Sequence, residues 1–209
     1  MDNGNYDRLV ARAVARVIIR APSKLYAAVG TARRLETIGV DSYVQAAAVL
    51  IVAGISAKIA GEEFSPDEQL IVELVKELDL RPPKENNWIK RSRATLDAVP
   101  DLTYAAMQIL LVAKIDELEE KLALASCKPT VELWANQSVS EMQHWYNVRL
   151  WQTVDHRYQG DRPNLLSNTL YRMLDKHRTL IAEVWPTRCE RDADVLENRQ
   201  QTPLFSVLV

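Results

Sequence analysis

The hydrophobic positions of the chain recur every three to four residues over most of its length, which is the spacing of one face of an α-helix. The only β-branched runs, at 17–19 and 49–52, lie inside such helical patterns. The pattern predicts an all-α protein, a multi-helix bundle of eight to ten helices in one or two sub-bundles. The predicted helices cover residues 6–20, 23–37, 41–60, 66–79, 86–98, 101–126, 138–158, 164–184 and 189–199.

The helix predicted at 41–60 contains an uncharged segment, from Ser42 to Ala57, that consists mostly of Ala, Val and Ile. A membrane-spanning helix needs about 20 predominantly apolar residues, and this segment is shorter and contains Gln45 and two serines. We therefore predict a central helix that its neighbours surround on nearly all sides, and no transmembrane segment.

Prolines and capping residues, rather than glycine turns, are expected to set the helix boundaries. Ser65, Pro66 and Glu68 combine a capping serine, a proline at the first helical position and the glutamate of a capping box. Ser138 and Glu141 repeat the Ser-x-x-Glu spacing. Both places are predicted helix starts.

The helix predicted at 101–126 carries an apolar seam with alternating spacings of four and three residues. Its members are Leu111, Ile115, Leu118, Leu122 and Ala125. Glu117 and Lys121, four residues apart, are expected to form an ion pair outside this seam. The seam indicates a bundle helix or a short dimer interface.

Residues 81–87, around the pair Pro82-Pro83, predict a linker because proline restricts the residue before it and removes a backbone donor. The predicted domains are 1–80, an N-terminal helical bundle with a basic first helix, and 88–209, a C-terminal helical bundle with an apolar tail. All five tryptophans lie in the second of these.

The composition, 47% hydrophobic and 26% charged, is typical of soluble globular proteins. The chain has only six glycines, and this low number argues against Gly-rich phosphate loops. The two cysteines, Cys127 and Cys189, lack a metal-binding or disulfide spacing, and the polar start does not resemble a secretory signal. We therefore expect a cytoplasmic location.

The net charge of −2 hides alternating blocks, since residues 1–34 are strongly basic and residues 35–80 strongly acidic. Arg8, Arg12, Arg16 and Arg20 recur every four residues, and Lys24 continues the row. On the first helix the four arginines form one basic stripe, and Lys24 continues the spacing after it. The stripe could bind an anionic membrane or a nucleic-acid backbone, or it could pack on the acidic block of the same chain.

A second basic cluster, Lys90, Arg91 and Arg93, follows Trp88. An aromatic residue beside several cations occurs in single-strand nucleic-acid binding, and it also occurs where an amphipathic helix buries a tryptophan. Both interpretations stay open.

Several carboxylates gather between Glu62 and Glu68. Asp67 and Glu68 are explained by the favourable effect of negative charge at a helix N-terminus. The alternative is a site for Ca²⁺ or Mg²⁺, which prefer oxygen ligands, with Glu63, Asp67 and Glu68 as the candidate ligands.

The run from Val49 to Leu80, above all Ala60-Gly61-Glu62-Glu63-Phe64-Ser65-Pro66-Asp67-Glu68, resembles the helix-loop-helix of TerB-like (tellurite-resistance) domains. The resemblance implies an all-helical, cytosolic bacterial domain linked to stress or phage defence. It also implies metal binding by acidic positions, which Glu63, Asp67 and Glu68 match here. The family's Asp-Gly pair is replaced by Gly61-Glu62.

An apolar tail, with Leu204, Phe205 and Leu208, follows a polar stretch and could pack into its own core or into a partner. We expect a non-catalytic interaction or assembly protein that uses the basic first helix and this tail, with a protein partner or a second copy of the chain. The alternatives are binding to nucleic acid or to an anionic membrane, and a TerB-like metal-responsive function. No cofactor is expected apart from the Ca²⁺ or Mg²⁺ of that alternative.

Overall fold

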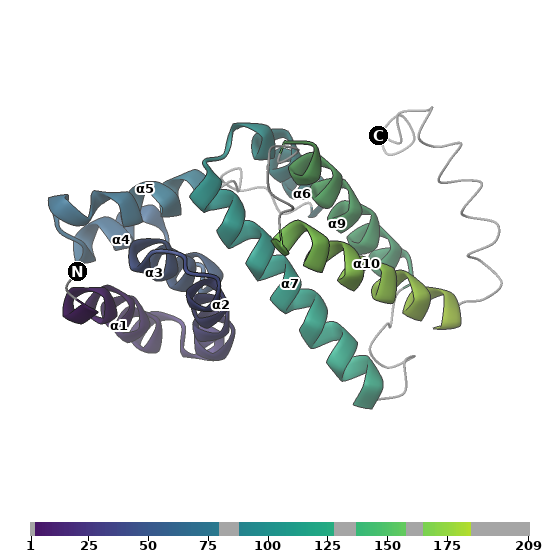
Figure 1. The fold of residues 1–209 in the computed structure, drawn as a ribbon, viewed down its shortest axis with the longest axis horizontal. Coiled ribbons are helices and arrows are strands. Elements are labelled where there is room, and N and C mark those ends of the chain that lie inside the picture. The colour runs from purple at the N-terminus through teal and green to yellow at the C-terminus, as the bar shows by residue number, and fades with distance from the viewer. Residues whose placement is uncertain (1–2, 80–87, 128–136, 158–164, 185–209) are drawn as a thin grey trace.

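The structure is a computed structural model that describes residues 3–79, 88–127, 137–157 and 165–184 (Figure 1). These residues form helices and no strand, so the predicted all-α multi-helix bundle is confirmed. The helix predicted at 189–199 lies outside the described residues. The α-helices are α1 (Asn3–Arg20), α2 (Leu25–Thr37), α3 (Ser42–Val52), α4 (Ala57–Glu63), α5 (Gln69–Leu78), α6 (Trp88–Ala98), α7 (Tyr104–Cys127), α9 (Gln137–Arg157) and α10 (Leu165–Val184), and the 3-10 helices are η1 (Pro22–Lys24), η2 (Pro66–Glu68) and η3 (Val99–Asp101).

Helix α3 forms the centre of the N-terminal half. Seven of its eleven residues are buried, because α1, α2 and α5 all pack against it. This confirms the prediction of a central helix that is apolar nearly all round. In the described part of the chain, no helix is both long and apolar enough to span a bilayer.

The single helix predicted at 41–60 is wrong, because the chain turns at Gly54 and α4 begins only at Ala57. Gly54 has φ 74°, and the backbone N–H of Ile55 donates to the carbonyl of Leu50 over 2.9 Å. Gly39 ends α2 in the same way, with φ 74° and a bond of 3.1 Å from Val40 N–H to the carbonyl of Leu35. Both are Schellman-type ends, which favour glycine because other residues resist a positive φ. The expectation that glycine turns set no boundary is therefore also wrong.

The predicted capping box at the start of η2 is confirmed. The Ser65 backbone N–H donates to Glu68 Oε2 over 2.8 Å, and the reciprocal side-chain bond is also present. The first turn is a 3-10 helix, and α5 continues it from Gln69. Helix α9 starts at Gln137, close to the second predicted start, but the side chains of Ser138 and Glu141 lie outside the described set.

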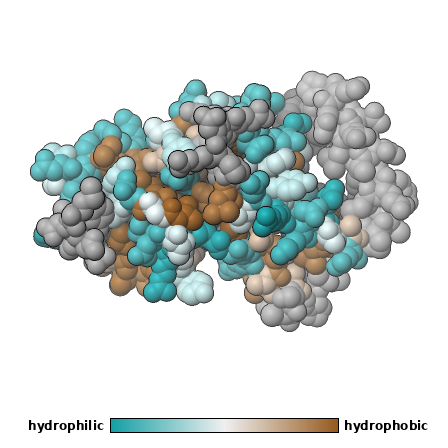
Figure 2. All heavy atoms as spheres, viewed as in Figure 1, coloured by the Kyte–Doolittle hydropathy of each residue, from teal (hydrophilic) through white to brown (hydrophobic). Residues whose placement is uncertain are grey.

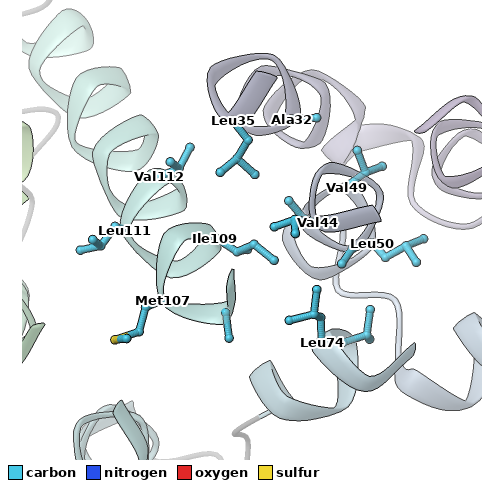
Figure 3. Packing of buried hydrophobic residues seen from close by; sticks show 14 of the residues in the cluster. Ala32, Leu35, Val44, Val49, Leu50, Leu74, Met107, Ile109, Leu111 and Val112 are labelled. Carbon is cyan, nitrogen blue, oxygen red and sulfur yellow. The ribbon is translucent and has the colours of Figure 1, made fainter. Parts of the chain in front are cut away.

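Helix α7 lies between the two halves of the molecule, with α1–α5 on one side and α6, α9 and α10 on the other (Figure 1). In Figure 3, Ile109 points toward α3, whereas Leu111 points to the opposite side of α7. The predicted seam residues Leu111, Ile115 and Leu118 are fully buried, so this part of the seam faces a core, whereas Leu122 and Ala125 are half-buried.

One contiguous cluster of buried residues runs from Ala13 to Leu174 and so includes residues from both sides of the 81–87 segment. Polar contacts add to it: Asp116 on α7 accepts hydrogen bonds of 2.7 Å from both Thr31 Oγ1 and Arg34 Nε on α2. The division into domains at 80 and 88 stays a prediction. The contacts show that α7 packs on helices from before that segment.

Helices α9 and α10 pack on each other, and α10 packs on α7. Their contact includes a polar chain in which Trp151 Nε1 donates to Ser167 Oγ over 3.1 Å and Ser167 donates to Asp155 Oδ1 over 2.7 Å. The Trp151 ring also lies 4.9 Å, centroid to centroid, from the ring of Tyr171. Trp145 and Trp151 pack against the core, while the side chains of the other three tryptophans lie outside the described set.

Candidate functional site

The middle of the basic stripe on α1 binds the acidic segment of the same chain. Arg12 Nη1 lies 2.6 Å from Glu68 Oε1, and Arg16 Nη2 lies 2.9 Å from Glu63 Oε2. Arg12 also donates to the main-chain carbonyl of Glu63, and its guanidinium carbon lies 4.8 Å from the centroid of the Phe64 ring. Two of the four arginines of the predicted stripe therefore hold α1 against the junction of α4 and η2.

The capping box orients Glu68 for this contact. One carboxylate oxygen accepts from Ser65, and the other accepts from Arg12. Partial burial would raise the pKa of Glu68, but the hydrogen bonds from Ser65 and Arg12 outweigh it and hold the pKa below its usual value. Glu68 is thus an ionised anchor for α1 over the ordinary pH range.

A polar pocket of about 420 Å³ lies beside these ion pairs. Its lining residues are Arg8, Arg12, Glu62, Glu63, Phe64, Ser65 and Glu68. Two of the three predicted metal ligands, Glu63 and Glu68, are therefore bound to arginines, and Asp67 is exposed. Within the described ranges, no three His, Cys, Asp or Glu side chains are placed to hold a metal ion. The metal assignment stays a prediction, and a cation here would compete with two guanidinium groups.

The side of α1 that faces away from the bundle is mostly apolar. Ala13 and Val17 are fully buried and define the inward side. At 100° per residue, the opposite side carries Arg8 at its N-terminal end and then Ala11, Ala15, Ile18 and Ile19. All five are exposed, and the four apolar residues are called here the outer face of α1. Ile18 is 53% and Ile19 70% exposed. An outward helix face in a globular protein is ordinarily polar, so this face is unusual.

The turn after α1 extends this surface. Tyr26, at the start of α2, is 94% exposed, and the residues of η1 that precede it are exposed as well. Figure 1 places this turn at the lower edge of the N-terminal half, and Figure 2 shows hydrophobic and hydrophilic residues side by side along that edge.

The charged residues of the chain from Arg8 to Leu35 are all basic, while the carboxylates of Glu62, Glu63 and Glu68 lie beside Arg8 and Arg12 at the bundle side of α1. Four basic residues there are exposed and form no ion pair with another described residue. These residues, called here the exposed cations, are Arg8, Arg20, Lys24 and Arg33. The outer end of the basic stripe therefore remains accessible to a negatively charged partner.

The second basic cluster lies on α6, beyond α7 from α1 (Figure 1). Lys90 and Arg93 are exposed, and Arg91 is half-buried. The structure thus does not bring the two predicted basic clusters together. The predicted assembly residues Leu204, Phe205 and Leu208 lie outside the described residues.

A buried polar cluster between α7, α9 and α10 was not recognised from the sequence. His144 Nδ1 lies 3.2 Å from His177 Nδ1, so one ring donates to the other. Burial, with the positive charge of Arg178, lowers the pKa of His144 to about 4. Burial, with the neighbouring His144 and Lys121, lowers the pKa of His177 to about 3. Both imidazoles are therefore neutral at neutral pH.

The predicted pair of Glu117 and Lys121 lies next to these histidines. Glu117 binds Lys114 and Lys121, each at 2.7 Å, and Lys121 also donates to Gln143 on α9 over 2.8 Å. Burial would raise the pKa of Glu117, but the two lysines outweigh it and hold the value at about 2. The spacing of Glu117 and Lys121 was the only sequence signal for this cluster.

Comparison with models of protein families, with curated proteins and with solved structures finds no match for this chain. The TerB-like resemblance of residues 49–80 therefore stays a prediction.

Proposed function

We propose that this chain is a non-catalytic docking protein that binds a negatively charged partner through the surface formed by α1, η1 and the start of α2. One observation carries the proposal: the outer face of α1 is apolar and exposed, and the charged residues from Arg8 to Leu35 are all basic. An exposed apolar patch with a polar rim is typical of an interaction site.

The ion pairs of Arg12 and Arg16 support a docking role because they fix the rotation of α1. Arg12 contacts both Glu68 and Glu63 as well as the Phe64 ring, so the helix is held on its bundle side. With that side fixed, Ile18 and Ile19 point outward as part of a rigid surface. A preorganised surface loses less conformational entropy on binding than a mobile one.

The test is binding of the full chain to immobilised heparin and to anionic vesicles at low salt. We expect retention that weakens as salt rises, because screening reduces the attraction between charges. The double variant Arg20→Glu, Lys24→Glu should lose this retention. Lys58→Glu, Lys176→Glu is the matched control, because both lysines are exposed and the change in net charge is the same. Absence of binding to every anionic probe would refute the proposal.

A further inference from the structure

The exposed cations are too widely spaced along α1 for a polyphosphate track. Arg12 and Arg16 are bound to glutamates, so only Arg8 and Arg20 remain available on this helix. Twelve residues separate them, which is about 18 Å at 1.5 Å per residue. The exposed groups between them are the methyl and butyl side chains of the outer face, which offer no donor to a phosphate. A nucleic-acid backbone is therefore a poor match for this surface.

A second copy of the chain on the same face is also a poor match. In a two-fold symmetric dimer the same patch contacts itself, so the cations of one copy would lie close to the cations of the other. Arg8, Arg20, Lys24 and Arg33 would then repel one another with no acidic residue from this stretch of the chain to compensate.

An anionic lipid surface matches both the exposed apolar side chains and the exposed cations of this region. Amphipathic helices at a membrane interface place apolar side chains at the boundary between headgroups and acyl chains, while neighbouring Lys and Arg contact lipid phosphates. Ile18, Ile19 and Tyr26 provide the apolar part, and a protruding tyrosine suits the interface because its ring is apolar and its hydroxyl polar.

We propose that the outer face of α1 and Tyr26 enter the interfacial region of an anionic membrane, and that the exposed cations bind the lipid phosphates. Helix α1 lies along this surface. This inference rests on the proposed docking function and names its partner. The helix enters as a folded element, because Arg12 and Arg16 keep it attached to η2 and α4.

The experiment is flotation of the full chain with phosphatidylcholine vesicles and with phosphatidylcholine vesicles that contain phosphatidylglycerol. We expect binding only to the second kind. Ile19→Ser should weaken that binding roughly tenfold, because its side chain no longer gains from leaving water. Lys24→Gln should weaken it on the order of fivefold, since each cation near an anionic surface contributes about that factor.

Leu165→Ser is the matched control for Ile19→Ser. Leu165 on α10 is 66% exposed, close to the 70% of Ile19, but lies on another helix. Its substitution should leave vesicle binding unchanged. Both positions are exposed, so neither variant removes a core contact, and equal melting temperatures would confirm that the fold is retained.

The outcomes separate this inference from the docking proposal. Binding to anionic vesicles that Ile19→Ser weakens and Leu165→Ser does not supports both. Binding to heparin or to an oligonucleotide without binding to vesicles overturns the membrane inference and leaves the docking proposal intact. Vesicle binding that Ile19→Ser, Ile18→Ser and Tyr26→Ser all leave unchanged also overturns the membrane inference. Binding to none of these probes overturns both.

Discussion

Acidification should destabilise the fold through the histidine pair between α9 and α10. His177 is fully buried and contacts His144 at 3.2 Å, and the positive charges of Lys121 and Arg178 lie close by. Glu117 is the nearby group that favours a charged His177. In an unfolded chain each histidine binds a proton near pH 6.5, whereas the folded values are about 3 and about 4. Above pH 6.5 the two histidines are neutral in both states and cost the folded state no free energy. As the pH falls from 6.5 toward the pKa values of the folded state, the unfolded chain gains protons and the folded state loses stability.

The size of the effect follows from proton linkage. Where a histidine is protonated in the unfolded chain and neutral in the folded one, each unit by which the pH falls lowers the free energy of unfolding by up to about 1.4 kcal/mol. Between pH 7 and pH 5 the two together lower it by about 4 kcal/mol at most, and we expect roughly 2–4 kcal/mol because His144 is partly exposed to water. That is a large fraction of the total stability of a typical domain, roughly 5–15 kcal/mol. Glu117 contributes little in this range, since its pKa lies below pH 5 in both states.

The assay is urea unfolding of the full chain at pH 7 and pH 5, followed by circular dichroism. His177→Asn should remove about half of the pH dependence, because asparagine can keep a polar group near the Nδ1 position but does not titrate. His156→Asn is the matched control, since His156 is exposed and on the same helix as His144. A free energy of unfolding that changes by less than about 1 kcal/mol between the two pH values would refute the reasoning.

Four further substitutions test other parts of the structure. Gly54→Ala should lower the free energy of unfolding by about 1–2 kcal/mol, because the φ of 74° at this position strains any side chain. Gly30→Ala should raise it by about 0.5–1 kcal/mol, because Gly30 is exposed on a helix and has open space around it. Thermal unfolding of the two variants checks both signs. Ile115→Ala should cost about 2–5 kcal/mol in urea unfolding, since its side chain is fully buried in the α7 core. Glu68→Ala should cost about 1–2 kcal/mol in thermal unfolding because it removes both the capping box and the Arg12 contact, and an unchanged melting temperature would contradict that account.

Local signals in the sequence were sufficient for much of the fold. The capping box at Ser65, the apolar seam of α7 and the buried α3 each depend on residues within a few turns of one another, and all three are confirmed. The end of α3 could also have been found locally. Gly54 follows an apolar run and precedes Ser56, which is the order of a glycine helix end and a new N-cap.

The histidine pair could not be predicted from spacing. His144 and His177 lie 33 positions apart on different helices, and their contact depends on how α9 and α10 rotate against each other. Neither residue has a neighbouring motif that marks it as half of a pair. Helix packing tolerates a range of rotations and crossing angles, so such contacts follow only from the assembled core.

The contacts of the basic stripe on α1 also could not be predicted from spacing alone. Four-residue spacing placed the cations of α1 on one side of a helix, but it left open whether they would bind the acidic block, a membrane or a phosphate backbone. In the structure the stripe divides: Arg12 and Arg16 bind glutamates, while Arg8 and Arg20 stay exposed. Arg8 lines the same pocket as the glutamates of this junction without forming an ion pair, whereas Arg20, the last residue of α1, is not among the residues that line it. An acidic segment as short as the one from Glu63 to Glu68 neutralises only the middle of a longer basic helix, so the two functions proposed for the stripe do not exclude each other. The internal ion pairs orient α1, and that orientation leaves its apolar outer face exposed to solvent.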